Sequence, residues 1–170
     1  MFKKIGISLI AAFSIGFAFL LILSNSDETK NEILNNQPSA EIPVEKKALF
    51  AIYTNGTFRV FTASMYHNLS DDVFIEPSNP NVVIVNKDGI TWRDLFATLP
   101  MELDENCLIT GTKQTFCSNG QFSLQFYING KRNQKALDQI INSKDKLLIT
   151  YESEDSLKIK PQIDSFPDLK

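Results

Sequence analysis

The chain has 170 residues and a formal net charge of -3, with 17 Lys and Arg against 20 Asp and Glu. Its cations form no basic stripe, so the composition argues against nucleic acid as a partner, because that affinity needs clustered cations to neutralise phosphates. The length leaves room for one folded domain with a single hydrophobic core, since other parts of the chain read as a membrane segment, a linker and a tail.

Residues 5–23 form an uncharged run, IGISLIAAFSIGFAFLLIL, long enough to cross about 30 Å of hydrocarbon as a helix. A basic start at residues 1–4 precedes it and acidic residues follow, so the amino terminus is expected in the cytoplasm and the rest outside. A single-pass signal anchor in the cell membrane is therefore predicted. A cleaved signal peptide is the alternative, although residues 21–26 offer no small-x-small cleavage motif.

Composition divides the remainder of the chain into three parts. Residues 24–47 are rich in Asn, Ser, Glu, Lys and Pro, which is typical of a flexible polar linker. Residues 153–170 carry many charges and two prolines, so a mostly disordered tail is expected. Between them, residues 48–152 are predicted to form a β-rich extracytoplasmic domain.

Asn-Gly pairs mark two turns in this domain. Residues 49–54 are apolar and aromatic, Asn55-Gly56 follows, and residues 57–62 resume as TFRVFT, a pattern typical of a β-hairpin. Residues 124–128, LQFYI, also run into an Asn-Gly pair. Both segments are therefore predicted to be strands that end in tight turns.

Two further strands and one helix are expected. Residues 82–85, VVIV, suit a buried strand, and residues 146–151, KLLITY, suit a strand near the end of the domain. Thr91 is a suitable N-cap for a helix, Asp94 lies three positions on, and Pro100 ends the apolar pattern. This order predicts an α+β fold in which one short helix covers a β-grasp-like mixed sheet. A small β-sandwich or open barrel is the alternative.

Cys107 and Cys117 are the only two cysteines. In an exported domain an even number of cysteines predicts a disulfide, here closing a short loop. A thiol-redox role is the alternative, but the spacing is not C-x-x-C and no histidine lies near either cysteine to lower a thiol pKa. A structural disulfide is therefore favoured.

The sequence identifies no catalytic residue and no metal or cofactor site. It contains no Gly-rich phosphate loop, no H-E-x-x-H motif and no nucleophile elbow, and His67 is the only histidine. The acidic residues lack the regular spacing of a calcium loop. A loop containing Tyr66, His67, Phe74 and Glu76 combines aromatic and polar side chains, and it is the candidate binding surface.

Two short motifs match the N-glycosylation pattern, at Asn55 and Asn68. They matter only in a host that glycosylates exported proteins. Asn55 is needed in the predicted turn, so Asn68 is the better candidate acceptor.

The segments FAIYTNG, NVVIVNKDGITWRDLFATLP, LQFYINGK and KDKLLITYE occur in this order between residues 49 and 152. In this respect the chain resembles a group of uncharacterised membrane-anchored proteins from archaea and uncultured bacteria. The resemblance implies an exported β-grasp-like domain.

Many members of that group carry paired histidines near the first and third strands, which suggests a metal site in them. None of the aligned positions is histidine in this chain, so the resemblance implies no metal site here. These positions are Glu45, Lys47, Phe74, Glu76, Ile84 and Asn86.

An anchor, a linker and a compact domain without assembled chemistry predict a non-catalytic binding module beside the membrane. Its expected partner is an envelope protein or polymer. The alternative is a metal-binding or thiol-redox envelope protein that uses Cys107 and Cys117, with His67 as a further ligand.

Overall fold

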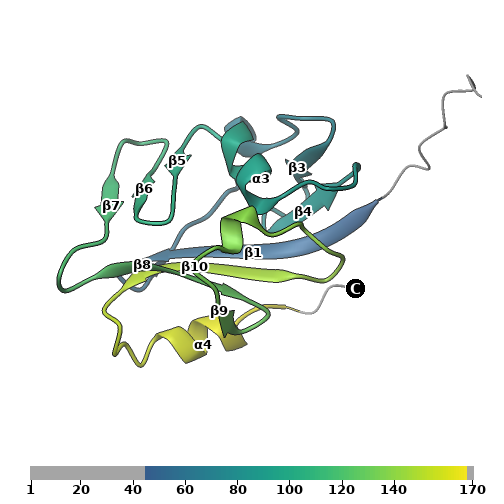
Figure 1. Ribbon diagram of the computed structural model, residues 1–170. Helices are drawn as coiled ribbons and strands as arrows, with labels where there is room; N and C mark the ends of the chain where they lie inside the picture. Colours follow the sequence, from purple (N-terminus) through teal and green to yellow (C-terminus); the bar gives the residue numbers. More distant parts are fainter. Residues whose placement is uncertain (1–44, 168–170) are drawn as a thin grey trace, which may run out of the picture. The chain divides into compact units, whose positions relative to one another are not determined.

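The computed structural model describes residues 45–167, which belong to one compact unit. This part of the chain contains two β-sheets and two short α-helices, so the predicted α+β class is confirmed (Figure 1). Within it, no helix is both long and apolar enough to cross a membrane. The predicted span at residues 5–23 lies outside the described residues and stays a prediction.

The larger sheet is built around two long parallel neighbours, β1 (Lys46–Thr54) and β10 (Lys146–Glu152). All its other strand pairs are antiparallel. The strand order is β3-β4-β1-β10-β8-β9, and β2 also pairs with β1. The remaining strands are β2 (Thr57–Phe58), β3 (Val73–Ile75), β4 (Val82–Val85), β8 (Ser123–Ile128) and β9 (Lys131–Arg132).

The main hydrophobic core lies on one face of this sheet. Because side chains alternate across a strand, Phe50 and Ile52 of β1 face this core, whereas Leu49 belongs to a separate small cluster. Helix α3 (Trp92–Thr98) covers the core and buries Trp92, Leu95 and Phe96. The expected single helix therefore packs on one face of a mixed sheet.

The predicted start of α3 is confirmed in its hydrogen bonds. The Thr91 hydroxyl accepts from the Asp94 backbone N–H at 3.2 Å, and the Asp94 carboxylate accepts from the Thr91 N–H at 2.8 Å. This reciprocal capping box satisfies two backbone donors that a helix start otherwise leaves unpaired. The helix ends at Thr98, with Leu99 as its C-cap, directly before Pro100.

A second, three-stranded sheet lies on the same side of the large sheet as α3 (Figure 1). It consists of β5 (Glu102–Leu103), β6 (Cys107–Ile109) and β7 (Thr115–Cys117), none of which was predicted. Cys107 and Cys117 are directly opposite each other in β6 and β7, and they form the predicted disulfide. Two 3-10 turns, η1 (Ser64–Tyr66) and η2 (Ala136–Asp138), complete the connections.

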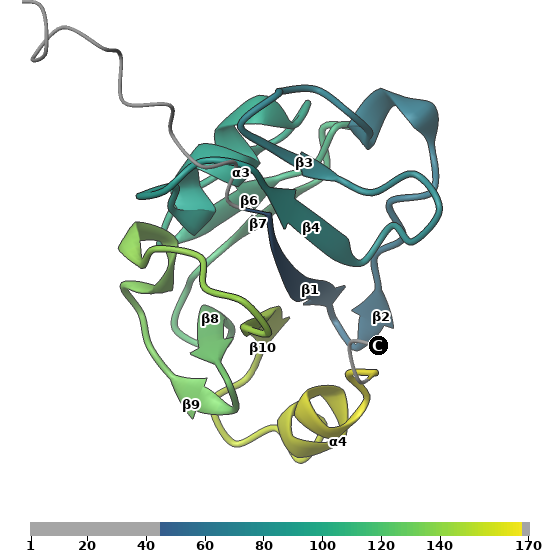
Figure 2. The ribbon, with the colours of Figure 1, turned by 90° about the vertical axis from the view of Figure 1, so that its right-hand side faces the viewer.

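Three boundaries differ from the sequence prediction. Strand β1 begins at Lys46, inside the predicted linker, and β2 ends at Phe58 rather than continuing to residue 62. The tail from residue 153 was expected to be disordered or weakly ordered, whereas residues Ile159–Asp164 form helix α4. Figure 2 shows α4 on the face opposite α3. Phe166, just after α4, packs against Leu49 and its neighbours, and this apolar contact gives the tail a surface to order on.

Candidate functional site

A cavity of about 250 Å³ opens between the segment that follows β2 and the turn that joins β6 to β7. Residues 58–61 and Tyr66 form one wall, and residues 110–112 form the other. Ile52, Met101 and Leu108 also line the cavity, which is called the Tyr66 groove below. Most of the cavity surface is apolar, and its lining residues come from both the large sheet and the small one.

Aromatic packing positions the first wall. Phe61 is 5% exposed, and its ring centroid lies 4.9 Å from that of Phe50 in the core and 5.1 Å from that of Tyr66. Such edge-to-face pairs are favourable beyond the area that they bury. Phe61 therefore fixes the chain after β2 to the core, and η1 turns Tyr66 back over it.

A glycine allows the second wall to come close to the first. A Cβ atom at Gly111 would lie 2.8 Å from the Pro100 carbonyl oxygen and 3.3 Å from the Tyr66 hydroxyl. The first separation is shorter than van der Waals contact permits, and the neighbour is backbone rather than a flexible side chain. Gly111 therefore sets how narrow the groove is.

The rim of the Tyr66 groove exposes large apolar side chains. Phe58 is 37% exposed, Val60 is 64% exposed, and Met65, next to Tyr66, is 49% exposed. Single exposed apolar residues are ordinary, but a group of them around a cavity is typical of a surface that contacts another molecule. The groove thus combines an apolar interior with an apolar rim.

Arg59 is the cationic residue in the lining. Its Nε donates to the Thr54 hydroxyl at 2.6 Å and its Nη1 donates to the Gln114 amide oxygen at 3.0 Å. Its guanidinium lies over the Phe116 ring, 5.0 Å from the centroid. All these partners are neutral, so they hold the guanidinium in place without neutralising its charge.

The side chains of the predicted binding loop do not gather at one site, although the backbone of His67 pairs with Ile75, between Phe74 and Glu76. Tyr66 lines the groove, and His67 is half-buried beside it, with Nε2 2.7 Å from the Phe61 carbonyl oxygen. That hydrogen bond gives His67 a role in holding the first wall. Phe74 packs in the small cluster on the opposite face of the sheet, and Glu76 lies beside it at a separate shallow depression.

The same depression contains the six positions at which the resemblance placed paired histidines. They come from β1, β3 and β4 and the residues that flank them, and alternation along neighbouring strands brings them to one face. Among them the chain supplies two carboxylates, one amine and one amide. The six are Glu45, Lys47, Phe74, Glu76, Ile84 and Asn86.

Both glycosylation motifs lie at tight backbone bends. Asn55 has φ 53° in the turn between β1 and β2, and Asn68 has φ 52° after η1. Asparagine adopts this left-handed conformation more readily than most residues. Both are exposed, and their modification stays a prediction.

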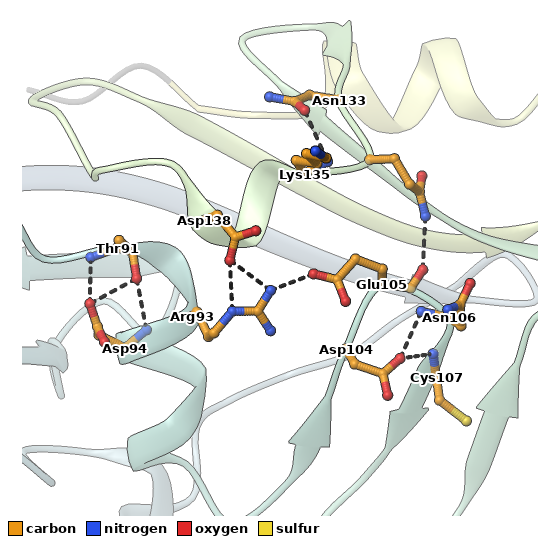
Figure 3. Close-up of polar contacts among 11 residues, drawn as sticks. Thr91, Arg93, Asp94, Asp104, Glu105, Asn106, Cys107, Asn133, Lys135 and Asp138 are labelled. Carbon is orange, nitrogen blue, oxygen red and sulfur yellow. Dashed lines mark hydrogen bonds and ion pairs between the residues drawn. The ribbon is translucent and has the colours of Figure 1, made fainter.

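A charged cluster lies apart from the groove, where α3 meets η2 and the β5–β6 loop (Figure 3). Arg93 donates to Asp138 at 2.8 Å from Nε and also to Glu105. These bonds, that to Asp138 first, raise the pKa of the Arg93 guanidinium. Because its charges are mutually paired, we interpret the cluster as a structural link between three elements.

A second polar region lies beneath α4. Glu152 is buried there, and its nearest cation is the Lys158 ammonium, 3.7 Å from the carboxylate. Gln125, also buried, donates from its amide nitrogen to the Glu152 carbonyl oxygen at 3.3 Å. Across residues 45–167, no three His, Cys, Asp or Glu side chains are grouped so that they could hold a metal ion.

Sequence reasoning missed most of the groove because it assigned residues 57–62 to one continuous strand. Strand β2 ends at Phe58, and the last backbone hydrogen bond to β1 runs from the Arg59 N–H to the Ile52 carbonyl oxygen at 2.8 Å. Arg59 and Val60 line a cavity instead of continuing the strand. A usable signal was present in TFRVFT, where Val60 and Phe61 are adjacent and so break the alternation of apolar and polar residues. A strand that buries one face would not leave Val60 exposed, but only the fold shows which face is buried.

The comparisons with known proteins identify no relative. No family model, no curated protein and no solved structure matches this chain.

Proposed function

We propose that residues 45–167 form a non-catalytic binding module, tethered outside the cell membrane by residues 5–23, which receives an apolar side chain of an envelope partner. The Tyr66 groove is the observation that carries this proposal. It is an open apolar cavity, and exposed Phe58, Val60 and Met65 surround it. These properties are typical of a surface that contacts another molecule.

The size of the groove limits what enters it. Sites for drug-sized ligands and cofactors occupy roughly 300–1,000 Å³. The groove has about 250 Å³, so it suits one large side chain rather than a whole cofactor. A protein partner that inserts a single anchor residue fits this volume, because such anchors in pockets contribute much of the affinity of an interface.

Strand order supports a β-grasp-like description of the module. The first and last strands of the large sheet, β1 and β10, are its parallel central pair. Strand β4 flanks β1, strand β8 flanks β10, and α3 lies between β4 and β8 in the chain. A fold of this kind hosts many functions, so the groove and not the fold supports the function proposed.

A thiol-redox role is less well supported. Both cysteines are joined to each other across neighbouring strands, and His67 is engaged with the Phe61 carbonyl rather than with a thiol. A redox centre needs an accessible, activated thiolate. The disulfide instead links β6 to β7, which carry one wall of the groove between them.

Site-specific cross-linking in the native membrane tests the proposal. A photo-reactive residue at position 60, on the rim, should yield a discrete adduct with an envelope protein. The matched control is position 140, where Ile140 is 48% exposed but does not line the groove. The same adducts from both positions, or none from position 60, would contradict the proposal.

Val60→Glu provides an independent variant. The Val60 side chain contributes little to the core, so the folded domain should keep its disulfide and its melting temperature. A carboxylate on the rim should prevent an apolar side chain from entering, because desolvating that charge is costly. Loss of the adduct in a folded protein supports the groove as the contact.

A further inference from the structure

The geometry points to the C-terminal residue of a partner polypeptide as the occupant of the Tyr66 groove, with its apolar side chain in the cavity and its α-carboxylate on Arg59. This inference rests on the proposed function and adds the chemistry of the ligand. It follows from three features of Arg59: its fixed position, its unneutralised charge and its place in the wall of the cavity.

Arg59 is held ready for an anion. The hydrogen bonds to Thr54 at 2.6 Å and to Gln114 at 3.0 Å fix two edges of the guanidinium, and Phe116 supports its face at 5.0 Å. An arginine on a free surface would lose side-chain entropy when it bound a ligand. Here much of that ordering is already present in the unbound protein.

The charge of Arg59 has no carboxylate partner among residues 45–167, since its side-chain contacts are a hydroxyl, an amide and a ring. A guanidinium has five N–H donors, and these bonds use two of them. The remaining donors suit a carboxylate, which guanidinium groups bind with paired hydrogen bonds. By contrast, Arg93 lies between two carboxylates and has its charge neutralised.

The position of Arg59 in the lining distinguishes between possible carboxylates. The cavity holds about one large side chain, and Arg59 belongs to its wall. In a peptide, only the C-terminal residue carries both a side chain and a free carboxylate on the same Cα atom. An internal Asp or Glu would use its own side chain for Arg59 and leave the apolar cavity to a neighbour.

Binding of two matched peptides tests the inference. The full chain in lipid nanodiscs would be titrated into two fluorescent five-residue peptides that end in Phe, one with a free carboxylate and one with a C-terminal amide. At low salt the acid should bind at least tenfold more tightly than the amide. Higher salt should narrow this ratio, because ions screen exposed charge pairs.

Gln114→Glu tests the role of the charge while Arg59 remains in place. The new carboxylate would pair with Arg59 at almost unchanged size, so affinity for the acid should fall about tenfold. Affinity for the amide should stay the same, and this excludes a general loss of folding. Arg59→Gln should likewise equalise the two peptides, and a circular dichroism spectrum would confirm the fold of each variant.

Three results would overturn the inference. Equal binding of acid and amide, with both lost in Val60→Glu, would retain the groove and refute the carboxylate. Absence of binding by either peptide would refute a C-terminal residue, while the cross-links from position 60 decide the proposed function separately. Displacement of the acid peptide by palmitate at equal concentration would assign the groove to lipid rather than to a polypeptide.

Discussion

The two sheets of this domain are stabilised in different ways. Strands β1 and β10 of the large sheet are buried along most of their length. In the small sheet, Leu108 is the one residue of β5, β6 and β7 that is fully buried. The small sheet instead has a disulfide between Cys107 and Cys117. Phe116 also packs against Tyr151 of β10, with their ring centroids 5.6 Å apart.

This difference explains where the groove lies. Burial of apolar surface makes the large sheet a rigid support, because it is the dominant favourable term in folding. Elements with few buried contacts open locally at lower cost, and binding loops are often found among them. The Tyr66 groove therefore has one wall fixed to the core by Phe61 and another on the β6–β7 turn, which a cross-link and Arg59 hold in place.

Phe50→Ala should have the greatest effect on stability, because it removes a fully buried ring from the core of the large sheet. Phe50 contacts Phe61 and also Phe96 of α3, with ring centroids 4.9 and 5.9 Å away. The free energy of unfolding should fall by about 3–5 kcal/mol in guanidinium titrations. Phe58→Ala, at a 37% exposed position, is the control and should change it far less.

Replacing Cys107 and Cys117 together by Ala should act on the small sheet. A cross-link that closes a loop of roughly this length contributes about 3 kcal/mol in the chain-entropy model. Hydrogen exchange should speed up in β6 and β7 before it does in β10, because the large sheet has its own core. Equal acceleration in both sheets would show that they unfold as one unit and would refute the proposed difference in how the two sheets are stabilised.

Gly111→Ala should move the wall of the groove at a smaller cost in stability. The new Cβ would meet the Pro100 carbonyl oxygen at 2.8 Å, and relief of such a clash costs about 1–3 kcal/mol. The free energy of peptide binding should fall by more than the free energy of unfolding, because the turn that carries residue 111 must shift against Tyr66. Gly120→Ala is the matched control, because a Cβ there meets nothing within 4 Å. If both variants bound the peptide with the same affinity, Gly111 would not set the width of the groove.

The sequence predicted the large sheet well because local signals and burial agree there. Asn55-Gly56 forms the turn after β1, and Val82–Val85 is the buried strand that its β-branched run indicated. The Thr91 cap could be predicted from the sequence because its hydrogen bonds are made within one helical turn. Each of these predictions depends on residues that are close together in the chain.

The groove could not be predicted in this way. Its walls come from segments about 50 residues apart in the chain, and their contact depends on Phe61 entering the core and on Gly111 lacking a Cβ. Strands β5, β6 and β7 are two or three residues long, too short for an alternating pattern to be recognised. Helix α4 was missed because its apolar residues are few, and it depends on the surface around Leu49.

Asp94→Asn should have the least effect, and its pH dependence identifies the cause. Hydrogen bonds from the backbone and the side chain of Thr91 lower the pKa of Asp94 below its ordinary value of 3.8. A lowered pKa means that the folded state favours the carboxylate, so this contribution is complete above that ordinary value and is lost as the pH falls through the folded-state pKa.

At pH 7 the variant should therefore lose about 0.3–1 kcal/mol, the usual effect of a carboxylate at a helix start. Urea titrations at pH 7 and at progressively lower pH should show the difference from the unmodified protein shrinking below pH 3.8. Asp155→Asn, which changes an exposed carboxylate outside α3, is the control.

Because α3 contacts β3 of the large sheet and β5 of the small one, loosening its first turn should weaken both sheets together. A loss confined to one sheet would show that α3 does not couple them.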